Sequence, residues 1–497
     1  MRKFTICVFL TVSVLCGNIF AQPSYNDYDE NETSKLRAFL LQESAEPGVK
    51  NYQQLGISDM DDINWGTVSG LEFQQYTNLL EQVRWSGRKL AGDLDLSGFK
   101  ILRNVQCATN ELNSINVAGS SDIINLDIYK NNFHTLDLTT NVNLEQICFK
   151  YNYLTEIDLS NNKKLTFLVC TGNQLETLDL TGLKKLSTLY CVQNNLTSLI
   201  LTDCEQLRYL WCMYNNLTSL DVSGKIHLRE MSCSDNDISD LRITGCDYLD
   251  SINCSNNNLQ SLDFSGCVEL RTLNCSKNVL ESIIIDDCLM LEDLLCFNNI
   301  LSSLTLPESP VLKSINCKNN YLDFYSLPKI SFENVNYIYY PQYLIEIEAD
   351  INHVDLSSFY EIEGYYSRFI WTDYKTLLHP EIIENGIFCF DESLNNKQLT
   401  CLIENGTYPK LVLQYEVIVT SDYVANARPE KNETFAYASD GYVHINASSA
   451  GDARFYSLQG ALLMTKKVDA GLTNIPIKRG VYIVSINNGK GFKLTVR

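Results

Sequence analysis

The sequence predicts a mainly β protein: a solenoid of 21-residue repeats, then a β-sandwich, then a small C-terminal β-domain. Two observations predict this class. A 21-residue frame recurs without insertion from Leu102 to about Leu322, and after Leu327 apolar and polar residues alternate in short runs between turn residues. One 21-residue unit cannot bury its own apolar residues, so neighbouring units have to stack and share a continuous core.

The repeat frame is L-x-x-L-x-C-x-x-N-x-L-x-x-L-x-L-x-x-x-x-x, and it recurs eleven times. Its ninth position is Asn in every unit: Asn110, Asn131, Asn152, Asn173, Asn194, Asn215, Asn236, Asn257, Asn278, Asn299 and Asn320. A buried Asn amide at the end of a strand can bond to the backbone of adjacent turns. These residues resemble the leucine-rich repeat family in a short bacterial form. The resemblance implies a parallel β-solenoid over residues 102–327, on the order of 50 Å long at about 4.8 Å per strand.

A second apolar pair in many units, such as LDLT at 178–181 and LDFS at 262–265, predicts a short extended segment on the convex side. Residues 22–101 leave the frame except for a partial repeat at 93–99, so we expect an N-terminal cap over the open end of the core. Within it, Leu36, Phe39 and Leu40 have helical spacing.

The cysteines form two periodic series. Nine occupy the sixth, inward position of the frame: Cys107, Cys170, Cys191, Cys212, Cys233, Cys254, Cys275, Cys296 and Cys317. Four more follow at a second position: Cys204, Cys246, Cys267 and Cys288. Equivalent Cβ atoms on parallel strands lie about 4.8 Å apart and point the same way, whereas a disulfide needs converging vectors. We therefore expect reduced thiols packed in the core, and we expect the out-of-frame Cys148 to be exposed.

After the repeats, the alternating segments over 328–422 predict a β-sandwich. Trp371 and the strand around Cys401 resemble the central positions of an immunoglobulin-like domain, although Val354 stands where that family has its first cysteine and Leu399 where it has a tyrosine. A pairing of Cys389 with Cys401 stays open. Residues 423–434 are interpreted as a linker.

Residues 435–497 resemble the C-terminal sorting domain of the Bacteroidetes type IX secretion system. The matching segments are YSLQG at 456–460, KRGVYIVSI at 478–486 and the closing KLTVR. AYASDGYVHI stands where that domain commonly opens with Asn-Pro, so an ordinary small β-domain is the alternative.

The N-terminus predicts export. Residues 1–21 combine a basic start, an apolar run and a small residue before Gln22, which is the layout of a signal peptide. Cys16 leaves a lipoprotein as the alternative. No other run is apolar and long enough for a membrane helix. A formal charge of −21 disfavours nucleic acid and anionic membrane surfaces as partners. We therefore expect a secreted or outer-surface location.

The sequence carries no catalytic signature, so we do not expect an enzyme. The five histidines are scattered, and no metalloprotease or serine-elbow motif is present. An acidic column at the fifteenth position is periodic, as turn-forming residues are, although calcium along it stays open. Its members are Asp137, Asp158, Asp179, Asp221 and Asp263. No cofactor and no metal site are expected.

The candidate binding site is a set of apolar residues that the frame places outward on the concave sheet in units two to six. They are Tyr129, Tyr151, Phe167, Val169, Tyr190, Val192, Tyr209, Trp211, Met213 and Tyr214. The following units carry mostly polar residues there, such as Ser232, Asn253 and Asn274. A localised apolar area indicates an interaction site, with Trp211 at its centre. We expect a protein partner. A glycan ligand, packing of the patch within the chain or against a second copy, and a passive spacer remain alternatives.

Overall fold

The computed structural model describes residues 28–307, 311–330, 335–373, 375–421, 435–439, 442–447, 450–456, 462–468, 471–477, 480–486 and 491–496. These residues fall into two compact units that divide near residue 343, with residues 410–413 joining the first unit. The predicted signal peptide and the predicted 423–434 linker lie outside the described residues.

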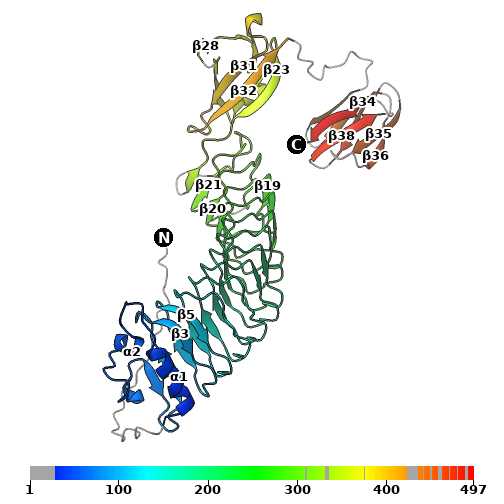
Figure 1. Ribbon diagram of the computed structural model, residues 1–497. Coiled ribbons are helices and arrows are strands. Elements are labelled where there is room, and N and C mark those ends of the chain that lie inside the picture. Colours follow the sequence, from blue (N-terminus) through cyan, green and yellow to red (C-terminus); the bar gives the residue numbers. More distant parts are fainter. Residues whose placement is uncertain are drawn as a thin grey trace. The chain divides into compact units, whose positions relative to one another are not determined.

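The first unit is a solenoid whose turns stack along one 14-stranded sheet, called the main sheet below (Figure 1). All eleven predicted units contribute one strand each, which confirms the parallel solenoid. In spatial order the strands are β1 (Leu71–Phe73), β2 (Leu80–Arg84), β4 (Asn104–Gln106), β6 (Asn125–Asp127), β7 (Gln146–Cys148), β8 (Phe167–Val169), β10 (Thr188–Tyr190), β12 (Tyr209–Trp211), β14 (Glu230–Ser232), β16 (Ser251–Asn253), β18 (Thr272–Asn274), β20 (Asp293–Leu295), β21 (Ser314–Asn316) and β22 (Asn336–Ile338).

The main sheet extends past both ends of the repeat frame. At the N-terminal end, β2 pairs in parallel with β4, and β1 adds to β2 as an antiparallel strand. At the C-terminal end, β22 pairs in parallel with β21, beyond residue 327 where the frame stops. The side chain of Gln342 donates to the carbonyl of Cys317 and accepts from the backbone N–H of Asn320 (3.0 Å), so it takes the place of the repeat Asn in this last turn.

The inward positions form the core. Every sixth-position cysteine is fully buried, and each is a free thiol. The second series is buried too, and the thiols of Cys204, Cys246 and Cys288 donate to the backbone of the preceding turn, as from Cys246 Sγ to the Val222 carbonyl (3.2 Å). Asn141 makes the same contact from the equivalent position, to the Val117 carbonyl. A thiol here therefore replaces an amide as a small, weaker donor.

Cys148 is half-buried, so the expectation that it is exposed is wrong. It lies on β7 in register with Asp127 on β6 and Val169 on β8. Its side chain points out of the core, but these cross-strand neighbours cover part of it because parallel strands lie only about 4.8 Å apart.

On the opposite side of several turns, short strands pair in twos, which confirms the predicted extended segments in those turns. β9 includes the first two residues of the LDLT segment, and β17 includes the first two of the LDFS segment. The pairs are β3 (Ala91–Asp95) with β5 (Glu111–Asn116), β9 (Thr177–Asp179) with β11 (Ser198–Ile200), β13 (Ser219–Asp221) with β15 (Asp240–Arg242), and β17 (Ser261–Asp263) with β19 (Ser282–Ile284).

Residues 28–101 cover the N-terminal end of the core with α1 (Glu30–Leu40), α2 (Asn51–Gln54) and a 3-10 turn, η1 (Trp65–Thr67). Asp29 caps α1 by accepting from the backbone N–H groups of Asn31 and Glu32. The predicted apolar face of α1 is buried, and its Phe39 stacks on Trp85 at 5.7 Å between ring centroids.

Residues 344–421 form two sheets of a β-sandwich. Trp371 on β27 meets Phe388 on β30 at 5.3 Å and the neighbouring Phe390 at 4.8 Å, so the two sheets pack face to face. The first sheet has the order β23 (Ile345–Asp350), β32 (Val412–Thr420), β31 (Lys397–Glu404), β27 (Arg368–Thr372), β28 (Leu377–Leu378). The second has the order β24 (Val354–Asp355), β30 (Ile387–Cys389), β29 (Glu381–Glu384). A two-stranded sheet, β25 (Glu361–Ile362) with β26 (Tyr365–Tyr366), and 3-10 turns η2 (Ser357–Phe359) and η3 (Glu392–Leu394) complete this part. Cys389 and Cys401 are both free thiols.

The C-terminal residues form two further sheets around a small apolar core that includes Val443 and Phe455. One has the order β33 (Phe435–Ser439), β34 (Tyr442–Ala447), β37 (Gly471–Pro476). The other has the order β36 (Leu462–Val468), β35 (Gly451–Tyr456), β38 (Gly480–Ile486), β39 (Gly491–Val496). Across all described residues, no helix is both long enough and apolar enough to cross a membrane.

Candidate functional site

Four aromatic residues of the main sheet, Phe167, Tyr190, Tyr209 and Trp211, lie on three adjacent strands, β8, β10 and β12. Parallel pairing puts Tyr190 beside Trp211, and it puts Thr188 between Phe167 and Tyr209. The central residue of each strand, such as Leu189 or Leu210, is buried in the core, so the flanking residues face outward.

The four aromatic rings make one continuous series of contacts, called the aromatic patch below. Tyr190 and Trp211 stack with centroids 4.4 Å apart and planes only 4° from parallel. Tyr209 stacks on Trp211 from the same strand at 5.7 Å and 15°, and Phe167 reaches Tyr190 at 6.2 Å and 57°. The Tyr190–Trp211 separation is close to the strand spacing of about 4.8 Å, so the sheet itself brings these two rings into contact.

All four rings of the aromatic patch are half-buried although they point away from the core. Each ring shields part of its neighbour, and Val169 lies in register beside Tyr190. Mutual stacking holds the side chains in one arrangement, which lowers the conformational entropy that a ligand would have to remove on binding.

The aromatic patch ends abruptly at β12. On β14 the residues in register with Tyr209 and Trp211 are Glu230 and Ser232. Asn253 and Asn274 continue the same column on β16 and β18. The main sheet therefore carries a localised apolar area rather than an even surface.

Five other predicted site residues follow their strands rather than lying within them. Val192 and Met213 come directly after inward cysteines and are half-buried. Tyr129 holds the same place in its unit, and the Lys150 ammonium lies over its ring at 4.8 Å. Tyr151 and Tyr214 have positive φ angles of 54°, so they lie in the left-handed turn that ends the strand.

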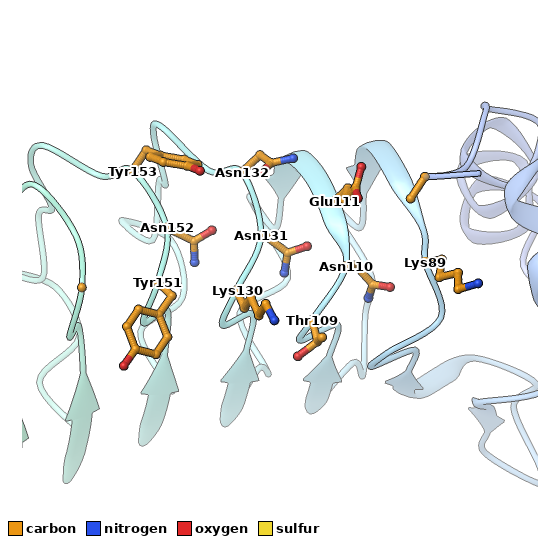
Figure 2. A pocket seen from close by; sticks show the side chains of 12 residues that line it. Lys89, Thr109, Asn110, Glu111, Lys130, Asn131, Asn132, Tyr151, Asn152 and Tyr153 are labelled. Carbon is orange, nitrogen blue, oxygen red and sulfur yellow. The ribbon is translucent and has the colours of Figure 1, made fainter. Parts of the chain in front are cut away.

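Tyr151 instead lines a groove at the N-terminal end of the solenoid (Figure 2). The groove has a volume of about 690 Å³. Sequence reasoning missed its other members, among them Lys89, Lys130 and Tyr153. The signal that could have found Lys130 and Tyr153 is the pair of positions on either side of the repeat Asn, the eighth and the tenth of the frame, whereas Lys89 precedes the first unit.

The shifted pKa values described here for the solenoid come from burial in the core and from hydrogen bonds within a turn. Burial raises the pKa of inward thiols, to about 12 for Cys233 and Cys275. Asp137 accepts from the hydroxyl and the backbone N–H of Thr139, and the hydroxyl hydrogen bond is the main cause of its lowered pKa. Within the described ranges, no group of three or more His, Cys, Asp or Glu residues could hold a metal ion.

Comparison with solved structures supports the fold. The functional domain of InlJ from Listeria monocytogenes, described as including a cysteine ladder, matches with a TM-score of 0.51 and 24% identity, over 64% of this chain and 72% of that one. YopM from Yersinia enterocolitica WA-314 matches with a TM-score of 0.36 and 22% identity, over 51% of this chain and 66% of that one. The leucine-rich repeat domain of APL1B matches with a TM-score of 0.39 and 23% identity, over 46% of this chain and 69% of that one.

No protein-family model and no curated protein sequence matches the chain. The match to the InlJ domain supports a leucine-rich repeat fold for the solenoid, and at 24% identity the likeness extends to the fold alone.

Proposed function

We propose that this chain is a binding protein rather than an enzyme, and that it holds a protein partner on the aromatic patch of the main sheet. The observation that carries the proposal is the stacked series Phe167, Tyr190, Trp211 and Tyr209, which ends at the polar strand β14. A contiguous apolar area with a polar border is typical of an interaction site.

The residue types favour a protein partner. Trp and Tyr are the side chains most enriched where alanine substitution costs a protein interface most. They bury a large area with only two rotatable side-chain bonds each, so little entropy opposes binding. Stacking has already ordered Trp211 between Tyr190 and Tyr209, which lowers this cost further.

The proposal places the protein outside the cytoplasm, secreted or on the outer cell surface. It rests on the signal-peptide pattern of residues 1–21 and on the resemblance of residues 435–497 to a sorting domain. In that setting a partner would be a surface or secreted protein of a host or of a neighbouring cell.

The test is a screen of the purified full chain on protein and glycan arrays, followed by affinity measurements on each ligand found. A Trp211→Ala, Tyr209→Ala double variant should bind the protein ligand at least about 30-fold more weakly, because the loss of a central aromatic contact costs roughly 2 kcal/mol or more. Leu295→Ala is the matched control, since Leu295 is a half-buried apolar residue at the position of Trp211, four strands away on β20. This control should bind as the wild type does.

The patch is excluded as the site if every ligand binds the double variant within about 1 kcal/mol of the wild type. A glycan ligand that loses affinity in the double variant would assign the patch to sugars instead. If neither array yields a ligand, the result favours a passive spacer over the proposed function.

A further inference from the structure

The groove at the N-terminal end of the solenoid is a second surface, separate from the aromatic patch. It spans successive turns, which repeat about every 4.8 Å. Its floor is the row Asn110, Asn131 and Asn152 (Figure 2). One rim consists of residues in left-handed turns, Thr109, Lys130 and Tyr151, and Lys89 lies beyond Asn110 at the end of the groove (Figure 2). The other rim consists of the residues that directly follow the floor Asn residues in the sequence: Glu111, Asn132 and Tyr153.

The amide N–H groups on the floor of the groove are already engaged in hydrogen bonds to the backbone. The Asn131 amide donates to the carbonyls of Cys107 and Ile128, both at 3.0 Å, and its oxygen accepts from the backbone N–H of Leu112. Asn152, one turn further along the chain, bonds in the same way to its own turn and to the preceding one. A ligand in the groove must therefore be recognised by the side chains of the rims.

Two tyrosines lie at one end of the groove, on either side of Asn152 (Figure 2). Tyr151 is 50% exposed and Tyr153 is 44% exposed. The ring of Tyr153 stacks on His134 at 5.2 Å and 19°, which fixes its orientation. Both tyrosines thus offer accessible ring faces on a rigid support.

The ring of Tyr151 occupies space that a glycine in the next turn leaves open. It lies over Gly172, and a methyl group at that position would collide with it. Gly172 is the only glycine at the eighth position among the eleven units, where every other unit has a larger residue. The sequence thus departs from its own repeat at the one turn where Tyr151 needs the space.

The charges around the groove balance. Lys89 forms an ion pair with Glu46, and Lys130 and Glu111 lie on opposite rims. A strongly anionic or cationic ligand would therefore gain no net attraction here. The residues around the groove offer amide, hydroxyl, ammonium and carboxylate groups, which can donate hydrogen bonds to uncharged polar groups and accept hydrogen bonds from them.

We propose that this groove binds a short neutral oligosaccharide, with sugar rings against Tyr151 and Tyr153. Pyranose rings combine an apolar C–H face, which packs on an aromatic ring, with hydroxyl groups at the edge that suit the mixed donors and acceptors of the rims. The spacing of the turns is close to the advance per sugar in an extended chain, so successive sugars would meet equivalent rim positions. An extended peptide would find no free partner for its backbone in the floor amides.

The test uses the full chain and three neutral trisaccharide probes, built of β-1,4-linked glucose, N-acetylglucosamine or mannose, with binding measured by calorimetry. At least one probe should bind, and Tyr151→Ala and Tyr153→Ala should each weaken it by roughly tenfold or more. Gly172→Ala should weaken it as well, by displacing the Tyr151 ring. Tyr214→Ala is the matched control, because Tyr214 occupies the same left-handed position three units away and is 55% exposed.

The proposal is overturned if no probe binds at millimolar concentration, or if Tyr214→Ala loses as much affinity as Tyr151→Ala. It is also overturned if a sulfated trisaccharide or an extended peptide competes better than every neutral probe. The melting temperature of each variant confirms that the fold is intact. The Trp211→Ala, Tyr209→Ala variant should keep sugar binding. The proposal for the groove and the proposal for the aromatic patch can therefore be refuted independently of each other.

Discussion

The side-chain amide of Asn215 donates to the carbonyl of Cys191, 24 residues earlier in the chain, at 3.0 Å. The same amide donates to Cys212 within its own turn, and its oxygen accepts from the backbone N–H of Leu196. One buried side chain therefore satisfies backbone groups of two turns that no strand pairs.

Asn215→Ala should destabilise the protein by roughly 3 kcal/mol or more, because it leaves buried carbonyls and a buried N–H without partners. The measurement is the urea unfolding midpoint. Asn216→Ala is the control, since Asn216 is exposed and should change stability by less than about 0.5 kcal/mol. Equal effects of the two substitutions would show that the hydrogen bonds of the repeat Asn do not contribute this stability.

The sixth-position cysteines, called the ladder cysteines below, should be unreactive in the native protein and fully reactive after unfolding. The thiolate is the reactive form, and burial raises the pKa of these cysteines, so little thiolate forms at neutral pH. Alkylation followed by mass measurement, before and after denaturation, counts the thiols. Cys389 is half-buried and should react ahead of them. Several disulfides among the ladder cysteines would contradict the stacked core.

A fragment that begins at Leu102 should aggregate or fail to melt cooperatively. It lacks α1 and β2, so the core residues that they cover at the end of the solenoid would meet water. Light scattering and thermal melting of the fragment, beside a chain that begins at Gln22, test this. A monomeric, cooperatively melting fragment would show that the N-terminal region is not needed as a cap.

Glu32 should make the stability of the cap depend on pH. Its carboxylate is 1% exposed and accepts from the backbone N–H of Leu80 at 2.8 Å. Burial, the main cause, raises its pKa, with Asp29 and Lys100 as the charged neighbours. A raised folded-state pKa gives a contribution that is present below the unfolded pKa, about 4.3, and lost as pH rises through the folded value.

Glu32→Gln removes this charge and keeps an oxygen that can accept from Leu80. The variant should therefore melt above the wild type at pH 7, and this gain should disappear below about pH 4, where the wild-type carboxyl is protonated as well. Glu30→Gln, on the exposed face of the same helix, is the control. The idea fails if the two variants show the same pH profile.

The repeat frame was sufficient to predict most of the solenoid, because its inward Leu, Cys and Asn positions recur at a fixed period and each maps to a buried site. It could not predict the last turn, since Gln342 lies 22 residues after Asn320 and differs from it by one methylene group. The longer Gln342 side chain makes the equivalent hydrogen bonds from a position one residue later than the 21-residue period predicts. A search for the fixed period therefore does not find it. Likewise, nothing in the frame marks β1 as antiparallel.

The candidate site was predictable only where strand alternation holds. Phe167, Tyr190, Tyr209 and Trp211 lie on strands, and the structure brings them together as alternation requires. Tyr151 and Tyr214 come after the strand, in a left-handed turn imposed by the stacked neighbours and not by the residue type, since Thr109 and Lys130 adopt it too. Local sequence therefore gave no reason to place Tyr151 in a groove.

The identical bonding of each turn to the next has a consequence for how such a chain changes over evolutionary time. If residues 249–269 were lost, Asn278 would follow Asn236 by one turn and could donate to Cys233 in place of Cys254, as Asn257 does now. A whole unit can thus be gained or lost without leaving a repeat Asn amide unmatched, and neither the patch on β8 to β12 nor the groove lies in the turns between 249 and 322. The solenoid can change length by duplication and deletion at one end while the surfaces at the other keep their residues and their spacing.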